Sequence, residues 1–241
     1  MNPRTDNSGK VKLGLVLFIV LLALVVARFV YRYADKATRL NDEAIEMMNM
    51  EKFDSALSKL DEALAEDPKH VPANYHRGIC LAERHRFDEA IEAFDRTIVL
   101  DPKSADSYFN KGKIYWYQNL YQEAVAPLEK ATELHEHLNK KNKGSAWLLL
   151  GESLYELHLD KLANNPEEAG QPTKAVAAFK AYLAERPGAP DKSAVRGKID
   201  ILENPDLEAN KLAIEKRKAE NKKKRRQIPL HELKKEVESK P

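Results

Sequence analysis

The chain of 241 residues repeats part of its own sequence at an interval of 34 residues. KFDSALSKLDEALAEDP covers residues 52–68, and RFDEAIEAFDRTIVLDP covers residues 86–102. Other positions recur at the same step: Phe53, Phe87 and Tyr121; Ala56, Ala90 and Ala124; Leu60, Phe94 and Leu128; Pro68 and Pro102; Ala44, Gly78 and Gly112. A unit of this length cannot bury its apolar face alone, so neighbouring units must stack on one another.

These positions resemble the tetratricopeptide repeat (TPR) family, in which each 34-residue unit is a pair of antiparallel helices. The resemblance covers residues 37–187 and implies an all-α fold, a right-handed superhelix of helix pairs. The residues suit such pairs. Gly78 and Gly112 lack a Cβ, which allows the two helices of a unit to come close together. Pro68 and Pro102 follow Asp where the second helix of a unit must end.

The spacing predicts about four repeats, at residues 37–70, 71–104, 105–138 and 144–187. The fourth repeat is altered, because about twelve extra residues near 159–172 separate its two helices. Glu136 stands where earlier repeats have Pro, which predicts a longer second helix in the third repeat. We expect a capping helix at residues 190–204, since a repeat array needs a cover for its last apolar face.

An apolar run, LGLVLFIVLLALVVARFVY at residues 13–31, follows an N-terminal tail at residues 1–12. A helix of roughly 20 apolar residues crosses the ~30 Å hydrocarbon core of a membrane. Arg28, the single charge, lies near one end, where its side chain can reach the headgroups. We therefore predict a single-pass transmembrane helix. Because no Gly or Pro occurs between Gly14 and Pro68, we expect this helix to continue into the first repeat.

A cleavable signal peptide is the alternative for this run. It needs an apolar region of about 7–15 residues followed by a cleavage site of small residues, and Phe29 and Tyr31 make that site poor. Lys and Arg residues are almost equal in number on the two sides of the run, so the positive-inside rule decides little. The paired lysines before the run, Lys10 and Lys12, favour a cytoplasmic N-terminal tail and repeats outside the cytoplasm.

Charge is distributed unevenly along the chain. Residues 1–36 have a net charge of +4 and residues 206–241 a net charge of +5, so the whole-chain value of +2 leaves −7 for the residues between them. The sequence holds a single cysteine, Cys80. An internal disulfide and a cysteine-based zinc site are therefore excluded.

Catalytic motifs are absent from the sequence. It contains no His-Glu-x-x-His, no glycine-rich phosphate loop and no Gly-x-Ser-x-Gly, which are the signatures of common metallohydrolases, nucleotide-binding proteins and serine hydrolases. His135 and His137 are two residues apart, so on a helix their rings would diverge. We predict no enzymatic activity, no metal and no cofactor.

In the TPR family, the first helices of successive repeats line a concave groove that holds a peptide or helix of a protein partner. The resemblance places this groove at Asn41, Ile45 and Met48; Tyr75 and Ile79; Phe109, Lys113 and Trp116; and Leu148, Glu152 and Tyr155. Aromatic side chains at such positions can anchor a ligand, or they can pack against neighbouring repeats. Some TPR domains bind the C-terminal carboxylates of heat-shock chaperones through basic and Asn side chains. Only Lys113 suits that role here, which disfavours this ligand.

The tail at residues 206–241 carries a basic patch: Lys216, Arg217, Lys218, Lys222, Lys223, Lys224, Arg225 and Arg226. Such a patch can contact anionic lipid headgroups, nucleic acid or the acidic body of the same chain, or it can remain solvated. Nucleic acid is the least favoured, since no aromatic residues interleave with the charges. Lipid contact is favoured by the predicted membrane anchor.

Taken together, these features predict a membrane-anchored TPR scaffold or adaptor that binds a partner protein in its groove and organises a membrane-associated assembly. The alternative is a periplasmic or secreted, chaperone-like TPR helper released by signal-peptide cleavage.

Overall fold

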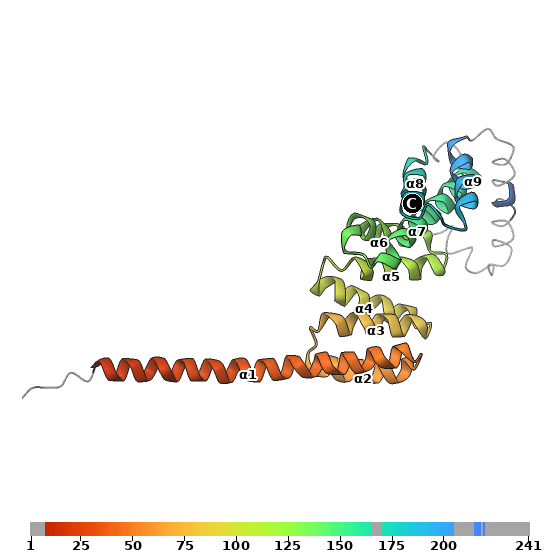
Figure 1. The fold of residues 1–241 in the computed structure, drawn as a ribbon. Coiled ribbons are helices and arrows are strands. Elements are labelled where there is room, and N and C mark those ends of the chain that lie inside the picture. Colours follow the sequence, from red (N-terminus) through yellow and green to blue (C-terminus); the bar gives the residue numbers. More distant parts are fainter. Residues whose placement is uncertain (1–7, 165–169, 205–214, 218, 220–241) are drawn as a thin grey trace, which may run out of the picture. The chain divides into compact units, whose positions relative to one another are not determined.

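The structure is a computed structural model that describes residues 8–164, 170–204, 215–217 and 219. These residues form α-helices and one short 3-10 helix, with no strand among them (Figure 1). The predicted all-α fold is therefore confirmed. The chain divides into two compact units, residues 1–101 (unit 1) and residues 102–241 (unit 2). The predicted right-handed superhelix of the whole array stays a prediction.

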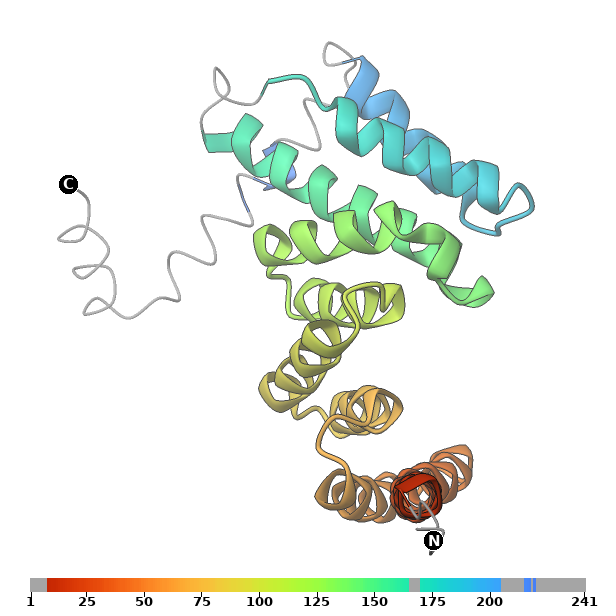
Figure 2. The same ribbon diagram turned by 90° about the vertical axis from the view of Figure 1, so that its left-hand side faces the viewer.

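Unit 1 consists of two helix pairs. The first pair is α1 (Ser8–Asn49) with α2 (Phe53–Glu66), and the second is α3 (Val71–Glu83) with α4 (Phe87–Leu100). α3 packs on both α1 and α2. Figure 2 looks along α1 and shows α2 beside it. Unit 1 thus has the helix order that two consecutive TPR units require.

α1 is a single helix of 42 residues that runs from the apolar segment into the first repeat. Its N-terminal part extends beyond the other helices of unit 1 (Figure 1). Side chains in this part are described at positions 16 and 18–28, and the large apolar ones from Val16 to Val26 are between 49% and 64% exposed. Over the part of the chain that the structure describes, no helix reaches the length and hydropathy of a membrane span. The transmembrane segment at residues 13–31 stays a prediction.

The turns inside three successive helix pairs have the same shape. Each contains one residue in the left-handed region, with φ of 57–60°: Glu51, His85 and Asn119. In each turn, the N–H of the next residue donates to the carbonyl oxygen five residues before it, at 2.9 Å. This is the Schellman bond that closes many helix C-termini. The 34-residue period of the sequence is therefore also a period of backbone conformation.

Close contact between the helices of a pair depends on glycine. A Cβ added at Gly78 of α3 would lie 2.7 Å from Cε1 of Phe94 on α4. At Gly112 the added atom would lie 2.6 Å from Cγ of Leu128. Carbon atoms in favourable contact are about 3.5–4.0 Å apart. Both positions therefore need the absence of a side chain, as the sequence predicts.

Unit 2 contains α5 (Ala105–Tyr117), α6 (Tyr121–Glu133), the 3-10 helix η1 (His135–His137), α7 (Lys140–Asn164), α8 (Thr173–Glu185) and α9 (Lys192–Glu203). The predicted longer second helix in the third repeat is wrong, because α6 ends at Glu133 and Glu136 lies in η1. The extra residues near 159–172 are used in two ways. Some extend α7 to Asn164, and others connect α7 to α8.

A carboxylate holds the start of α7 in place. The Asp106 side chain accepts hydrogen bonds from the Asn139 backbone N–H at 3.3 Å and from the side-chain amides of Asn139 and Asn142 at 2.8 and 2.7 Å. Asp106 lies in the first turn of α5. These bonds therefore tie the beginning of α7 to the beginning of α5.

α9 packs on α8 at the end of unit 2. Its buried side chains, Val195, Ile199 and Leu202, join Phe179 and Tyr182 of α8 in one apolar cluster. The Tyr182 hydroxyl donates to a carboxylate oxygen of Asp191 at 2.5 Å. Burial, together with this bond, raises the pKa of Tyr182 to about 12.

Candidate interaction surface

In unit 1, the candidate groove residues lie on α1 and α3, which are in contact. Asn41 is 4% exposed, and its Oδ1 lies 2.8 Å from Nδ1 of His76. Ile45, Met48 and Ile79 are half-buried. We call the surface formed by Asn41, Ile45, Met48, Tyr75 and Ile79 the α1–α3 surface.

Tyr75 of the α1–α3 surface packs against the rings of His76 and Phe94. The half-buried Tyr75 ring lies 6.0 Å from the Phe94 ring and 5.4 Å from the His76 ring, centroid to centroid. The pKa of His76 is lowered, chiefly because burial disfavours the imidazolium and also because His70 is nearby, while Asp42 acts in the opposite direction. His76 is therefore favoured in its neutral form between the two helices.

In unit 2, the candidate residues lie on α5 and α7, which are also in contact; we call this part the α5–α7 surface. Phe109 and Tyr155 are only 4% and 6% exposed. Both belong to the apolar core of unit 2. Lys113 is exposed, and Trp116 and Leu148 are half-buried.

Burial divides the candidate residues into enclosed and partly accessible ones, the two alternatives that the sequence left open for the aromatic positions. Asn41, Phe109 and Tyr155 have their side chains inside the fold. The i, i+4, i+7 spacing places residues on one side of a helix, but it does not say how much of that side a neighbouring helix covers. The candidate residues that keep exposed surface are Ile45, Met48, Tyr75, Ile79, Lys113, Trp116, Leu148 and Glu152.

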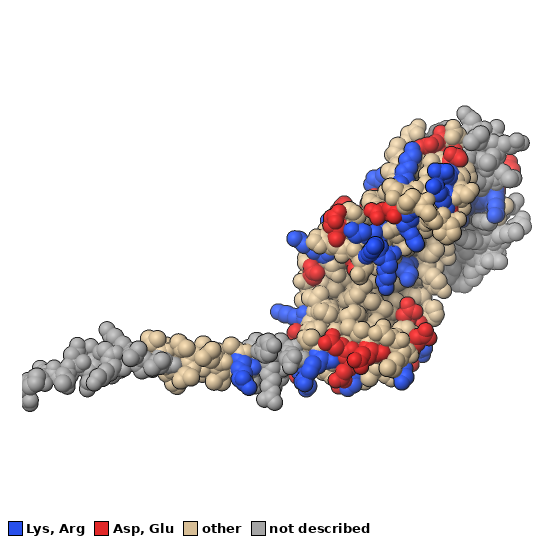
Figure 3. All heavy atoms as spheres, viewed as in Figure 1, with Lys and Arg blue, Asp and Glu red and all other residues tan. Residues whose placement is uncertain are grey.

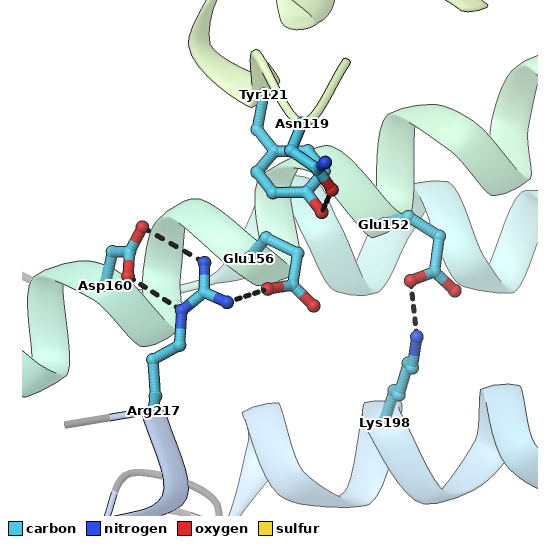
Figure 4. Close-up of polar contacts among 7 residues, drawn as sticks. All are labelled: Asn119, Tyr121, Glu152, Glu156, Asp160, Lys198 and Arg217. Carbon is cyan, nitrogen blue, oxygen red and sulfur yellow. Dashed lines mark hydrogen bonds and ion pairs between the residues drawn. The ribbon is translucent and has the colours of Figure 1, made fainter. Parts of the chain in front are cut away.

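Glu152 has a cationic neighbour from α9. Its carboxylate forms an ion pair and hydrogen bond with Nζ of Lys198 (Figure 4). Nζ of Lys198 also lies 5.1 Å from the centroid of the Tyr155 ring, within the range of a cation–π contact. α9 therefore reaches the α5–α7 surface through one lysine.

Two acidic residues that the sequence analysis did not select continue the line of Glu152 along α7. The Glu156 and Asp160 carboxylates both bind the guanidinium of Arg217 (Figure 4). Glu152, Glu156 and Asp160 stand at i, i+4 and i+8, a spacing that can be read from the sequence. Their importance was missed because it depends on a cation about sixty residues further along the chain.

The basic patch is described only in part. Lys216 is exposed, whereas the Arg217 side chain is 12% exposed. Lys218, Lys222, Lys223, Lys224, Arg225 and Arg226 lie outside the described residues. Of the contacts considered for the patch, the structure contains the one with the acidic body of the same chain.

Charge also gathers elsewhere on the surface. On the face shown in Figure 3, Asp and Glu side chains cluster over part of unit 1, and unit 2 carries both signs. Within the described ranges, no group of three or more His, Cys, Asp or Glu side chains could hold a metal ion. Burial raises the pKa of the Cys80 thiol to about 12, so this thiol is inert at neutral pH.

Comparison with known proteins identifies the repeat. A family model described as tetratricopeptide repeat matches residues 41–105 and 109–190, which is more than half of the chain. The chain belongs to the tetratricopeptide repeat family. The TPR matches begin at residue 41, inside α1, include α2, α3 and α4 of unit 1, and end at residue 190, beyond α8 of unit 2. No curated protein sequence matches this TPR chain.

Solved structures share the fold. The TPR chain is similar to a crystal structure of MamA, with 21% identity, 81% of this chain and 98% of that chain covered, and a TM-score of 0.56. It is also similar to MamA from residue 41 to its end, from Desulfovibrio magneticus RS-1, with 18% identity. That comparison covers 81% of this chain and 98% of that chain, with a TM-score of 0.57. A third similar structure is PilF of Pseudomonas aeruginosa, with 17% identity. That comparison covers 77% of this chain and 74% of that chain, with a TM-score of 0.55. At these identities the likeness concerns the fold alone.

Proposed function

We propose that the protein is a membrane-anchored TPR scaffold that binds a partner protein and organises a membrane-associated assembly. Membership of the TPR family supports a protein-interaction role. The observation that carries the proposal is that the first helices of the pairs keep half-buried apolar side chains in each unit: Ile45, Met48 and Ile79 in unit 1, and Trp116 and Leu148 in unit 2. Burying such side chains under a ligand contributes affinity, and helices that are already ordered lose little entropy on binding.

The membrane anchor in this proposal is residues 13–31. Its support is the apolar sequence of that run and the exposure of its described large apolar side chains from Val16 to Val26, which are between 49% and 64% exposed. Apolar area left in water costs about 25 cal/mol per Å², so a helix with this surface gains from entering hydrocarbon. The N-terminal tail is proposed to lie in the cytoplasm and the repeats on the other side of the membrane.

Fractionation of cells that make the full chain tests the anchor. We expect the protein to remain with membranes after an alkaline carbonate wash and to keep its original amino terminus. We also expect added protease to reach the repeats from the extracytoplasmic side. Release by carbonate, or an amino terminus that begins beyond residue 31, would instead support the secreted helper.

Site-specific photo-crosslinking tests the interaction surface. A benzoylphenylalanine placed at Met48, Ile79 or Lys113 should crosslink to discrete partner proteins in cells, which mass spectrometry then identifies. Matched controls are the exposed Ser58 of α2 and Ala126 of α6, which lie on second helices. If the controls capture the same proteins equally well, the first-helix surfaces are not the binding site.

A further inference from the structure

Three carboxylates form a stripe on α7. Glu152, Glu156 and Asp160 are spaced by four residues, so they lie one above another on the same side of the helix. Like charges at this spacing destabilise a helix by a few tenths of a kcal/mol per pair. The stripe is therefore unfavourable for α7 by itself and is stabilised by cations that approach from outside the helix.

Arg217 meets two of these carboxylates with a matching geometry. Its Nε lies 2.8 Å from Oδ1 of Asp160, and its Nη2 lies 3.3 Å from Oδ2 of the same residue. Its Nη1 lies 3.1 Å from Oε2 of Glu156. Figure 4 shows the planar guanidinium between the two side chains, with all three nitrogens engaged. Two parallel bonds to one carboxylate are a geometry that arginine provides and lysine does not.

The place that holds the guanidinium is partly shielded from water. The side chain of Arg217 is 12% exposed and that of Glu156 is 23% exposed, whereas the neighbouring Lys216 is exposed. Tyr121 of α6 lies across the carboxylates from Arg217 in the view of Figure 4. Its pKa is raised, first because its hydroxyl is partly buried and then because Glu156, Glu152 and Asp160 are close.

Burial of Glu156 makes its charge unfavourable without a nearby cation. Burial raises the pKa of its carboxyl group, while the charges of Arg217 and Lys198 act in the opposite direction. Removing the guanidinium leaves a partly buried carboxylate next to Asp160, and such a group gains from binding another cation. The stripe is thus a built receptor rather than a solvated row of charges.

We propose that Glu156 and Asp160 form a guanidinium-binding site for an arginine-bearing basic peptide of a protein partner, and that residues 215–217 of the chain's own tail occupy this site until the partner displaces them. The inference rests on the proposed protein-binding function and names the chemistry of the ligand. It also gives one part of the basic tail a role as an internal competitor. A linked segment acts at an effective concentration on the order of millimolar.

Peptide binding to the full-length protein in detergent tests this inference. The probe is a fluorescent peptide with the sequence of residues 211–221, KLAIEKRKAEN, and the readout is fluorescence anisotropy. The proteins are wild type, Arg217→Ala, the matched control Lys216→Ala, and Arg217→Ala combined with Glu156→Gln and Asp160→Asn. Circular dichroism melts check that all four are equally folded.

We expect Arg217→Ala to bind the peptide at least about tenfold more tightly than wild type does, for a Kd of about 0.1 mM or lower between the unoccupied site and either the peptide or the tail. The factor follows from competition with a tail at about 1 mM. Lys216→Ala should behave as wild type. Binding should fall about tenfold or more in the triple variant, and with a peptide whose arginine is replaced by Ala.

Three results would overturn the inference. Equal affinity for wild type and Arg217→Ala means that the tail does not occupy the site. Full binding to the triple variant means that the peptide binds elsewhere, and full binding of the Ala peptide means that only overall charge is recognised. Crosslinking at Met48 and Ile79 in unit 1 does not involve α7, so it tests the proposed function separately.

Discussion

Gly112 provides a direct measure of how closely the helices of a TPR pair must approach. In Gly112→Ala, the new Cβ would lie 2.6 Å from Cγ and 2.9 Å from Cδ2 of Leu128, and 3.3 Å from its backbone nitrogen. The contact is with the middle of the side chain and with the backbone, so rotation of Leu128 cannot relieve it. α5 and α6 must separate by roughly 1 Å to restore ordinary contact distances of about 3.5–4.0 Å.

The magnitude follows from two opposing effects. Overpacking of a well-packed core costs about 1–3 kcal/mol, and this contact belongs in the upper part of that range because a backbone atom is involved. Ala gains about 1 kcal/mol over Gly in a helix interior. We therefore expect Gly112→Ala to lower the free energy of unfolding by about 1–2 kcal/mol.

Two glycines of the same unit serve as controls. A Cβ at Gly197 of α9 would meet nothing within 4 Å, so Gly197→Ala should stabilise by about 1 kcal/mol through helix propensity alone. At Gly144 the nearest atoms are Cδ and Cγ of Arg186, a flexible and exposed side chain that can move away. Gly144→Ala should be neutral or slightly stabilising.

Urea unfolding followed by tryptophan fluorescence is the appropriate assay. The two tryptophans of the chain, Trp116 and Trp147, both pack against the core of unit 2, the unit that contains the three glycines. The reasoning predicts a difference of about 2–3 kcal/mol between Gly112→Ala and Gly197→Ala. If both variants were stabilised to the same extent, the tight approach of α5 and α6 would be refuted.

Two further predictions concern side chains that join one helix to another. The lowered pKa of His76 means that the unfolded chain takes up a proton at higher pH than the folded chain does. The contribution of His76 to the free energy of unfolding should therefore be fully present above the usual pKa of 6.5 and should be lost as the pH falls through the lower folded pKa. Urea midpoints at pH 7.5 and 5.5 measure this loss. In His76→Gln, the part of the pH dependence that comes from His76 should disappear. Asp106→Ala should lower the free energy of unfolding by about 1–2 kcal/mol, because the start of α7 loses its hydrogen bonds to a charged acceptor. Asp200→Ala on the exposed side of α9 is the control and should change it by less than about 0.5 kcal/mol; equal effects of the two substitutions would contradict the role assigned to Asp106.

The parts of the fold that could be predicted depend on short-range pattern. The 34-residue period specifies which residues face each other within a pair, and it led to Gly78 and Gly112 as close contacts. The uninterrupted sequence from Gly14 to Pro68 correctly predicted that the apolar segment and the first repeat share one helix, although α1 ends at Asn49, before Pro68. In both cases the physical cause lies within a few residues or within one repeat.

The parts that could not be predicted depend on contacts between distant residues. The boundary between η1 and α7 is set by Asp106, more than thirty residues before Asn139, and no local signal marks that pairing. Phe109 and Tyr155 share a helix side with the accessible candidates, but the depth of their burial depends on neighbouring helices. The Arg217 contact required knowledge of where the tail runs.

The length of α1 has a consequence for orientation. If residues 13–31 are held in a bilayer, α1 links them to unit 1 as one continuous helix. The anchor then fixes both the rotation of unit 1 about the axis of α1 and its distance from the bilayer. Each residue added to an α-helix advances it by about 1.5 Å and turns it by about 100°. One alanine inserted between Tyr31 and Ala37 would therefore rotate the α1–α3 surface by about 100° around the axis of α1 relative to the anchor. Seven inserted residues, close to two full turns, would restore the original orientation of the α1–α3 surface and move it about 10 Å further from the anchor.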